Sequence, residues 1–192
     1  MQVNVKLITD MTTEPITLAE AKRHLRIDES YTDEDDDILD WIKSARLKAE
    51  KHTGRSLGTK TLELISDKFP AVDYIEIPKG PVQSVTSIIY TDKEEAEHTF
   101  GSDNYVTNLD IVTPIIKLKH GKSWPSDTLY PTGAIRIRYV AGYTVIPSDI
   151  KSAIKLEVGD FYINRENVTE KQQYEILNSS KKLLNSYRLE FL

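Results

Sequence analysis

The chain has 192 residues, enough for one domain with a hydrophobic core, and its 39% hydrophobic and 29% charged residues are ordinary for a globular protein. It carries a formal net charge of -5 and no cysteine, which excludes disulfides and thiolate chemistry and disfavours a role in gripping DNA phosphates. No apolar run is long enough to cross a bilayer, and residues 1–15 lack the features of a secretion signal, so we expect a cytoplasmic protein without a membrane partner.

The first predicted helix covers residues 17–27. Thr17 can cap this helix, and Glu20 completes a T-x-x-E capping box. Apolar residues then recur on one face at helical spacing: Leu18, Ala21 and Leu25.

A second and longer helix is predicted over residues 36–53. Gly54 stands where a glycine commonly ends a helix. The apolar residues of this segment again follow the helical period: Ile38, Trp41, Ile42, Ala45 and Ala49.

Residues 60–143 change to the alternating pattern of strands. Ile135, Ile137 and Tyr139 alternate with Arg136 and Arg138. Turn sequences separate the alternating runs, among them Pro78-Lys79-Gly80-Pro81, Gly101-Ser102-Asp103-Asn104 and Trp124-Pro125-Ser126-Asp127. The segment predicts a small antiparallel β-sheet.

Helical periodicity returns after Pro147, over residues 148–165 and then 171–187. The predicted fold class is therefore α+β. It is mainly a bundle of about four helices, with a small antiparallel sheet inserted between the second and third long helices. We expect one domain over residues 1–192.

Two short motifs suggest chemistry but fail on spacing. A calcium loop that starts at Asp33 needs glycine at its sixth position and an acid at its twelfth, where the chain has Ile38 and Ser44. The acids from Asp33 to Asp37 are better explained as a helix N-terminus. The Gly121-Lys122-Ser123 sequence lacks the first glycine of a phosphate-binding loop and is followed by Trp124-Pro125, so a turn is predicted there.

The sequence offers no candidate catalytic, cofactor-binding or metal-ligating residue. The four histidines share no metal-like spacing, and neither an HExxH nor a GxSxG sequence is present. An enzymatic function is therefore not supported by any motif of the sequence.

The C-terminal sequence KKLLNSYRLEFL is unusually apolar for a chain end. One interpretation is that this tail folds back on the protein's own core. The other is that it docks on a partner through residue types that are enriched at interfaces; the candidate anchors are Leu184, Tyr187, Arg188, Phe191 and Leu192.

Four stretches of the chain form a combined sequence pattern: Glu14 to Asp28, Asp35 to Leu57, Ile75 to Asp92, and Val145 to Val168. The pairing of TLAEAKRHLRID with the later KGPVQSVTSI is the most specific part of this pattern, and the strand AIRIRYVAGY also fits. Together the four stretches resemble the head–tail connector, or adaptor, family of long-tailed phages.

The resemblance implies a structural virion protein at the head–tail junction, present in the host cytoplasm during assembly. It implies a ring of about twelve copies mounted on the portal protein, with a stopper or tail-completion protein on the other side. DNA would pass through this ring without sequence-specific binding, and no catalytic activity, metal or cofactor is implied.

The segment from Asp28 to Asp40 contains eight acids and no Lys or Arg. Repeated around a ring, it would create a strong negative field. We hypothesise that five of its acids face the DNA channel, and the alternative is that they face outward and keep free subunits soluble. These acids are Asp33, Glu34, Asp35, Asp36 and Asp37.

Two other functions remain open. A small phage-encoded enzyme or nuclease accessory would need carboxylates or histidines that converge on a metal site. An interaction module of a host protein would be distinguished by its gene neighbourhood, because a connector gene should lie close to portal and capsid genes.

Overall fold

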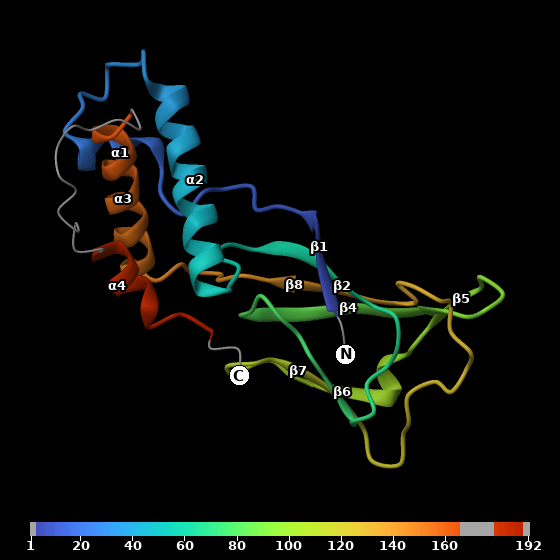
Figure 1. The fold of residues 1–192 in the computed structure, drawn as a ribbon. Coiled ribbons are helices and arrows are strands. Elements are labelled where there is room, and N and C mark those ends of the chain that lie inside the picture. The colour runs from blue at the N-terminus through green and yellow to red at the C-terminus, as the bar shows by residue number, and fades with distance from the viewer. Residues whose placement is uncertain (1–2, 166–178, 190–192) are drawn as a thin grey trace. The chain divides into compact units, whose positions relative to one another are not determined.

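The computed structural model describes residues 3–165 and 179–189. The chain divides into two compact units. We call Met1–Met11 with Thr59–Tyr143 the sheet unit, and Thr12–Gly58 with Thr144–Leu192 the helical unit. Figure 1 shows the elements of each unit along the chain. That the two units act as one connector domain stays a prediction.

Four helices lie in the described part of the helical unit: α1 (Leu18–Leu25), α2 (Asp35–Thr53), α3 (Ser148–Ile163) and α4 (Ser179–Asn185). The predicted capping box is present, because Thr17 accepts a hydrogen bond from the Glu20 N–H and the Glu20 side chain accepts one from Thr17. Gly54 ends α2 with a φ of 71°, in the left-handed region that glycine adopts without strain. The first three predicted helices are confirmed to within a few residues.

The fourth helix is shorter in the described residues than predicted. It spans Ser179–Asn185, and a turn follows at residues 186–187. Residues 171–178 of the predicted helix lie outside the described residues. None of the helices described here has the length and apolar character of a membrane span.

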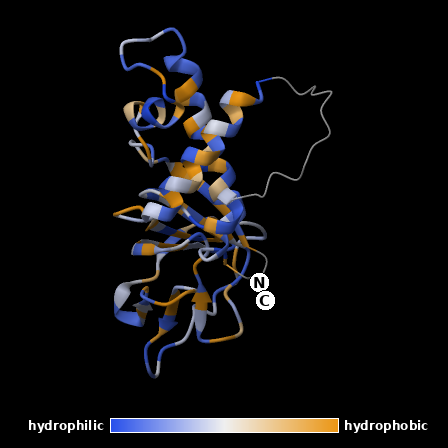
Figure 2. Cartoon of the chain, turned by 90° about the vertical axis from the view of Figure 1, so that its left-hand side faces the viewer, coloured by the Kyte–Doolittle hydropathy of each residue, from blue (hydrophilic) through white to orange (hydrophobic). Residues whose placement is uncertain are grey.

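The core of the helical unit is built from the inward faces of its helices. α2 and α3 pack against each other, and α4 packs against both. Figure 2 shows apolar residues gathered along these helices. The fully buried apolar side chains of the helices include Ala21, Ile38, Ile42, Ala45, Ala49, Ile150, Ala153, Ile154, Val158 and Leu184.

The sheet unit holds two antiparallel sheets. A five-stranded sheet has the strand order β1-β2-β8-β4-β5, and a three-stranded sheet has the order β3-β7-β6. The strands are β1 (Val3–Thr9), β2 (Lys60–Ser66), β3 (Tyr74–Glu76), β4 (Val82–Thr91), β5 (Glu97–Thr99), β6 (Tyr105–Asn108), β7 (Ile115–Leu118) and β8 (Ile135–Ala141), with a short 3₁₀ helix, η1 (Ser102–Asn104).

The α+β class is confirmed, but the predicted arrangement of the sheet needs a correction. The chain forms two sheets where one small sheet was predicted, and β1 precedes α1, outside the predicted insertion. The strand was missed because its partner is remote in sequence: Val5 pairs with Leu64 on β2. As an edge strand it is mostly exposed, and Val5 is its one residue packed against the sheet core.

The two sheets share one apolar core. The register pairs Leu64 with Ile137 and Leu62 with Tyr139, so these side chains occupy the same face of the five-stranded sheet. Ile75 and Ile116 of the three-stranded sheet belong to the same buried cluster. The alternation of Ile135, Ile137 and Tyr139 in the sequence therefore correctly predicted which face of β8 is buried.

Candidate interaction surfaces

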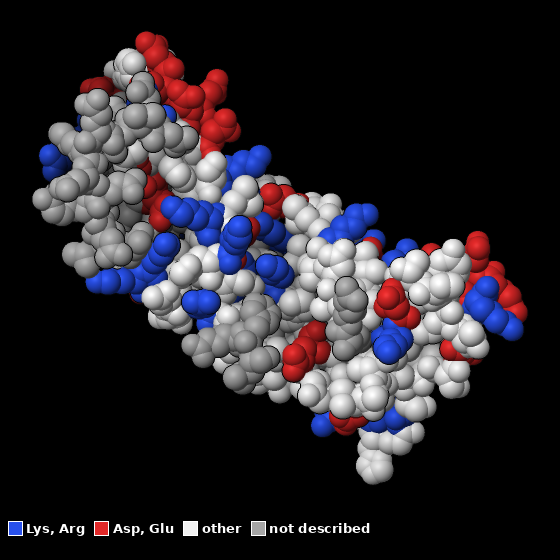
Figure 3. All heavy atoms as spheres, viewed as in Figure 1, with Lys and Arg blue, Asp and Glu red and all other residues white. Residues whose placement is uncertain are grey.

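The acidic segment, Asp28 to Asp40, forms the loop before α2 and the first turns of that helix. Figure 3 shows its red carboxylates gathered at this end of the helical unit. Asp33, Asp36 and Asp37 are exposed, whereas Glu34 and Asp35 are half-buried. Three of the five predicted acids therefore face solvent, and the other two form ion pairs with residues of the helical unit.

A buried lysine holds the first part of the acidic segment. The Lys22 ammonium on α1 lies 2.5 Å from the Asp35 carboxylate. It also donates hydrogen bonds to the carbonyl oxygens of Tyr31, at 2.7 Å, and Glu29, at 3.3 Å. A buried ammonium is costly unless hydrogen-bond acceptors and an opposite charge surround it. Two carbonyl hydrogen bonds and the ion pair with Asp35 therefore fix the course of this loop around Lys22.

Arg165, at the end of α3, holds Glu34. Its Nη2 donates a hydrogen bond of 2.7 Å to Glu34 Oε1, and this bond raises the pKa of Arg165. Its guanidinium carbon also lies 5.2 Å from the centroid of the Trp41 ring and 4.8 Å from that of Tyr162. We call Glu34, Trp41, Tyr162 and Arg165 the arginine clasp. Cation–π contacts of this kind stabilise the cation where it lies, so the clasp fixes the N-terminus of α2 relative to α3.

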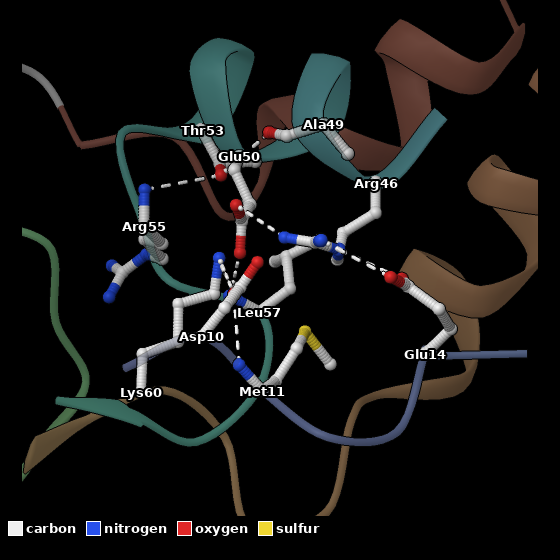
Figure 4. Close-up of polar contacts among 10 residues, drawn as sticks. All are labelled: Asp10, Met11, Glu14, Arg46, Ala49, Glu50, Thr53, Arg55, Leu57 and Lys60. Atoms are coloured by element: carbon white, nitrogen blue, oxygen red, sulfur yellow. Dashed lines mark hydrogen bonds and ion pairs between the residues drawn. The ribbon is translucent and has the colours of Figure 1, made fainter. Parts of the chain in front are cut away.

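Arg46 is the largest fully buried side chain of the helical unit. Figure 4 shows its guanidinium between two carboxylates. It contacts Glu14 through Nε at 2.8 Å and Nη2 at 3.2 Å, and Glu50 through Nη1 at 3.3 Å. Glu50 also accepts a hydrogen bond from the Leu57 N–H at 3.0 Å. Arg46 thus ties α2 to the segment before α1 and, through Glu50, to the loop that follows α2.

A third buried charge joins α2, α3 and α4. Glu157 on α3 lies 2.5 Å from the Lys48 ammonium, and its other oxygen accepts a hydrogen bond of 2.5 Å from the Ser180 hydroxyl. Sequence analysis missed Lys22, Arg46 and Glu157. Helical spacing places each of them on the apolar face of its helix, as with Arg46 four residues after Ile42 and Glu157 three residues after Ile154. The signal was therefore present, but charged side chains are so rarely buried that the spacing was not interpreted in this way.

The predicted docking residues of the C-terminal tail separate in the structure. Leu184 is 3% exposed and belongs to the core; its place among the docking anchors is therefore corrected, since a covered side chain cannot contact a partner. Tyr187 is half-buried and Arg188 is exposed. Phe191 and Leu192 lie outside the described residues.

The described part of the tail folds back on the helical unit, as one of the two interpretations expected. The Arg55 Nε donates a hydrogen bond of 2.6 Å to the Tyr187 carbonyl. The Leu189 N–H donates one of 2.9 Å to the Thr53 carbonyl at the end of α2. His52 and Asn185 are joined by a further hydrogen bond of 2.8 Å. These contacts bring the chain to Leu189 beside the end of α2.

The motifs weighed for chemistry form turns or solvated surface. Gly121 has a φ of +75°, and the Lys122 N–H donates to the Lys119 carbonyl, so the Gly121-Lys122-Ser123 sequence is a turn with no helix after it. Within the residues that the structure describes, no group of three or more His, Asp or Glu side chains is placed to hold a metal ion.

The sheet unit has an open hollow of about 420 Å³ between β4 and β6. None of its lining residues is charged, and they offer no carboxylate or imidazole for acid–base work. The lining residues are Gln83, Ser84, Val85, Ser102, Tyr105, Val106, Thr107 and Leu109.

Solved structures of similar fold come from gene transfer agent particles. A chain from the neck of an empty particle, computed with C6 symmetry, matches with a TM-score of 0.79 and 20% identity over 100% of this chain and 97% of that chain. A chain from the virion of a native gene transfer agent particle gives 0.80 and 19% over 98% and 96%. One from the neck of a native particle, computed with C12 symmetry, gives 0.74 and 20% over 100% and 97%.

No curated protein matches the chain. The sequence model of the phage gp6-like head–tail connector proteins matches residues 15–119, which is more than half of the 192 residues. The chain belongs to the phage gp6-like head–tail connector family.

Proposed function

We propose that this protein is a structural connector that joins the head of a phage or phage-like particle to its tail. The family membership over residues 15–119 carries the proposal. The fold match over the full chain to a chain of a particle neck supports it independently. The role is one of binding, with no catalytic step, and the enzyme alternative has no positive observation in its favour.

The connector works as a ring of about twelve copies. Matches to chains of necks with C12 and C6 symmetry support this stoichiometry. One face of the ring binds the portal protein, and the other binds a stopper or tail-completion protein. Free subunits in the host cytoplasm assemble on the portal, which raises their local concentration enough for the ring to close.

The exposed acids Asp33, Asp36 and Asp37 face the channel, with Glu34 and Asp35 holding the segment behind them. Negative charge on a channel wall repels DNA phosphates, so the duplex slides without adhering. The fixed course of the segment, through Lys22 and Arg165, supports a constant position on the wall.

Lysine at Asp33, Asp36 and Asp37 together should slow DNA passage, because cations would bind the phosphates as they pass. The measurement is the rate of DNA release from particles triggered in solution. The matched control carries three lysines at the exposed acids Glu94, Glu95 and Glu97 of the sheet unit. Equal release rates for wild type and the acidic-segment variant would place these acids away from the DNA.

The tail docks on the portal through Tyr187, Arg188, Phe191 and Leu192. The exposed position of Arg188 supports this role. Leu184 is left out because it is buried.

The connector role itself is tested by mixing the purified protein with its cognate portal and imaging the product by electron microscopy. A ring that caps the portal is the expected result. Particles that keep their tails and remain infectious after deletion of the gene would overturn the proposal.

A further inference from the structure

Two exposed apolar stripes on the helical unit have no partner among the described residues. On α2, Leu39 and Leu47 are 45% and 49% exposed, and on α3, Leu156 and Ile163 are 39% and 79% exposed. Solvent-facing helix positions are normally polar. These four residues therefore leave apolar surface that a packed neighbour would cover.

Each stripe carries one charge at its centre. Leu39, Lys43 and Leu47 recur every four residues and share one face of α2, which we call the α2 stripe. Leu156, Asp160 and Ile163 are spaced by four and three residues and share one face of α3, which we call the α3 stripe. The central charges of the two stripes are opposite in sign, and each has an apolar residue on both sides.

The dimensions of the stripes also agree. At 1.5 Å per residue, the α2 stripe is about 12 Å long and the α3 stripe about 10 Å. Lys43 and Asp160 are both exposed, and neither forms an ion pair with another described residue. Asp160 Oδ1 accepts a hydrogen bond of 2.9 Å from the Asn164 side chain, which leaves its other carboxylate oxygen for a cation. Laid together, the stripes would place the Lys43 ammonium against the Asp160 carboxylate, with an apolar pair on each side.

The two stripes cannot meet within one chain. α2 and α3 already pack against each other through other residues, such as Ile42 and Ile154, which are fully buried. The stripes therefore lie on the outward faces of the two helices. A ring requires an interface of this kind, in which one patch of a subunit meets a different patch of its neighbour.

We infer that the α2 stripe of one copy packs on the α3 stripe of the next copy, with Lys43 and Asp160 paired at the centre. This inference rests on the proposed ring and names its subunit interface. The central ion pair sets the register of the two helices, because a shifted alignment would bury each charge against a leucine or isoleucine.

Charge reversal tests the pairing in assembled particles. Lys43→Glu and Asp160→Lys should each lower the fraction of heads that carry a connector ring by about tenfold or more, because like charges then face each other at every interface. The double variant K43E/D160K should restore most of the loss. Both positions are exposed, so the thermal unfolding of the purified variants should match wild type.

Cross-linking tests whether the two stripes lie next to each other in the ring. Because the chain has no native cysteine, only the introduced cysteines can react. Lys43→Cys with Asp160→Cys, treated with a short bis-maleimide in assembled necks, should give a ladder of covalent multimers on a denaturing gel. Each single variant should stay monomeric. The control pair Lys43→Cys with Lys182→Cys, which uses an exposed position on α4, should give no ladder.

Rings that are intact on micrographs but give no ladder would overturn the inference and leave the connector role standing. So would normal assembly of both single charge reversals. Necks that contain no ring of the wild-type protein would remove the connector proposal, and this inference would fall with it.

Discussion

Buried charges organise the helical unit residue by residue. Arg46 is 1% exposed and serves two carboxylates, Glu14 and Glu50, from different parts of the chain. A charge removed from water is costly unless it is paired and hydrogen-bonded. Arg46 therefore stabilises one arrangement of α2, the segment before α1 and the loop that follows α2, and penalises arrangements that separate them.

Arg46→Met should lower the free energy of unfolding by about 3 kcal/mol, because it leaves Glu14 and Glu50 partly buried without their cation. The measurement is chemical denaturation of the purified protein. Lys43→Met, an exposed change on the same helix, should alter stability by about 0.5 kcal/mol or less. Equal effects of the two changes would show that the Arg46 network contributes little.

The capping box of α1 makes the stability of the folded protein depend on pH. The backbone N–H of Thr17 donates to Glu20 and lowers the pKa of that carboxyl from 4.5. A carboxyl whose pKa is lowered in the folded state contributes its full stabilisation above pH 4.5 and loses it as the pH falls through the lowered value.

Glu20→Gln should therefore flatten the fall in melting temperature below pH 4.5, because glutamine keeps the capping hydrogen bond but does not titrate. Some acid sensitivity should remain in the variant. The Ser30 hydroxyl lowers the pKa of Asp28, and the His98 side chain lowers that of Asp92. Identical pH profiles for wild type and variant would contradict the assignment.

At the scale of the elements, α2 has opposite charges at its two ends. Its first turn holds Asp35, Asp36 and Asp37, and its last turn holds Lys51 and His52. This arrangement is favourable for the helix dipole. It also separates an acidic end from the basic end on which the tail folds, so the two ends of one helix differ in charge.

The arginine clasp links this acidic end to α3. Arg165→Ala should raise the rate of amide hydrogen exchange across residues 29–37, because Glu34 then loses its cation and the loop opens more often. Arg165→Lys keeps the charge but has no planar group to stack on Trp41 and Tyr162. Its rate of amide exchange should therefore lie between the rates of the wild type and of Arg165→Ala. Unchanged exchange in both variants would show that Lys22 alone holds the segment.

At the scale of the whole molecule, the tail contributes to the helical unit up to Leu189, and residues 190–192 include two of the proposed docking residues, Phe191 and Leu192. The Leu189 N–H bonds to Thr53, and Leu184 is buried. Stability and assembly should therefore respond separately to changes on the two sides of this point.

Deletion of residues 190–192 should leave the melting temperature unchanged and weaken portal binding by about tenfold or more, because Phe191 and Leu192 are removed from the docking set. Leu184→Ala should instead lower the free energy of unfolding by about 2 to 4 kcal/mol by creating a cavity. Calorimetry and a portal pull-down separate the two effects. A truncated protein that binds the portal normally would overturn the docking proposal.

Local sequence determined the parts of this protein whose physical causes are local. The capping box of Thr17 and Glu20, the glycine that ends α2 and the alternation along β8 act over a few residues, so the helix positions and the buried faces could be predicted. The acidic segment and the turn at Gly121 could be predicted for the same reason. The resemblance to the connector family could also be found in the sequence alone.

Tertiary structure alone decided which partners the buried charges have and which strands are paired. Arg46 meets Glu14 across 32 residues of sequence, Lys48 meets Glu157 across 109, and Val5 pairs with Leu64. No periodic pattern encodes such partners, because burial depends on what the rest of the chain brings to the site. The burial of Leu184 and the contact of Arg165 with Glu34 also depend on residues that are distant in sequence.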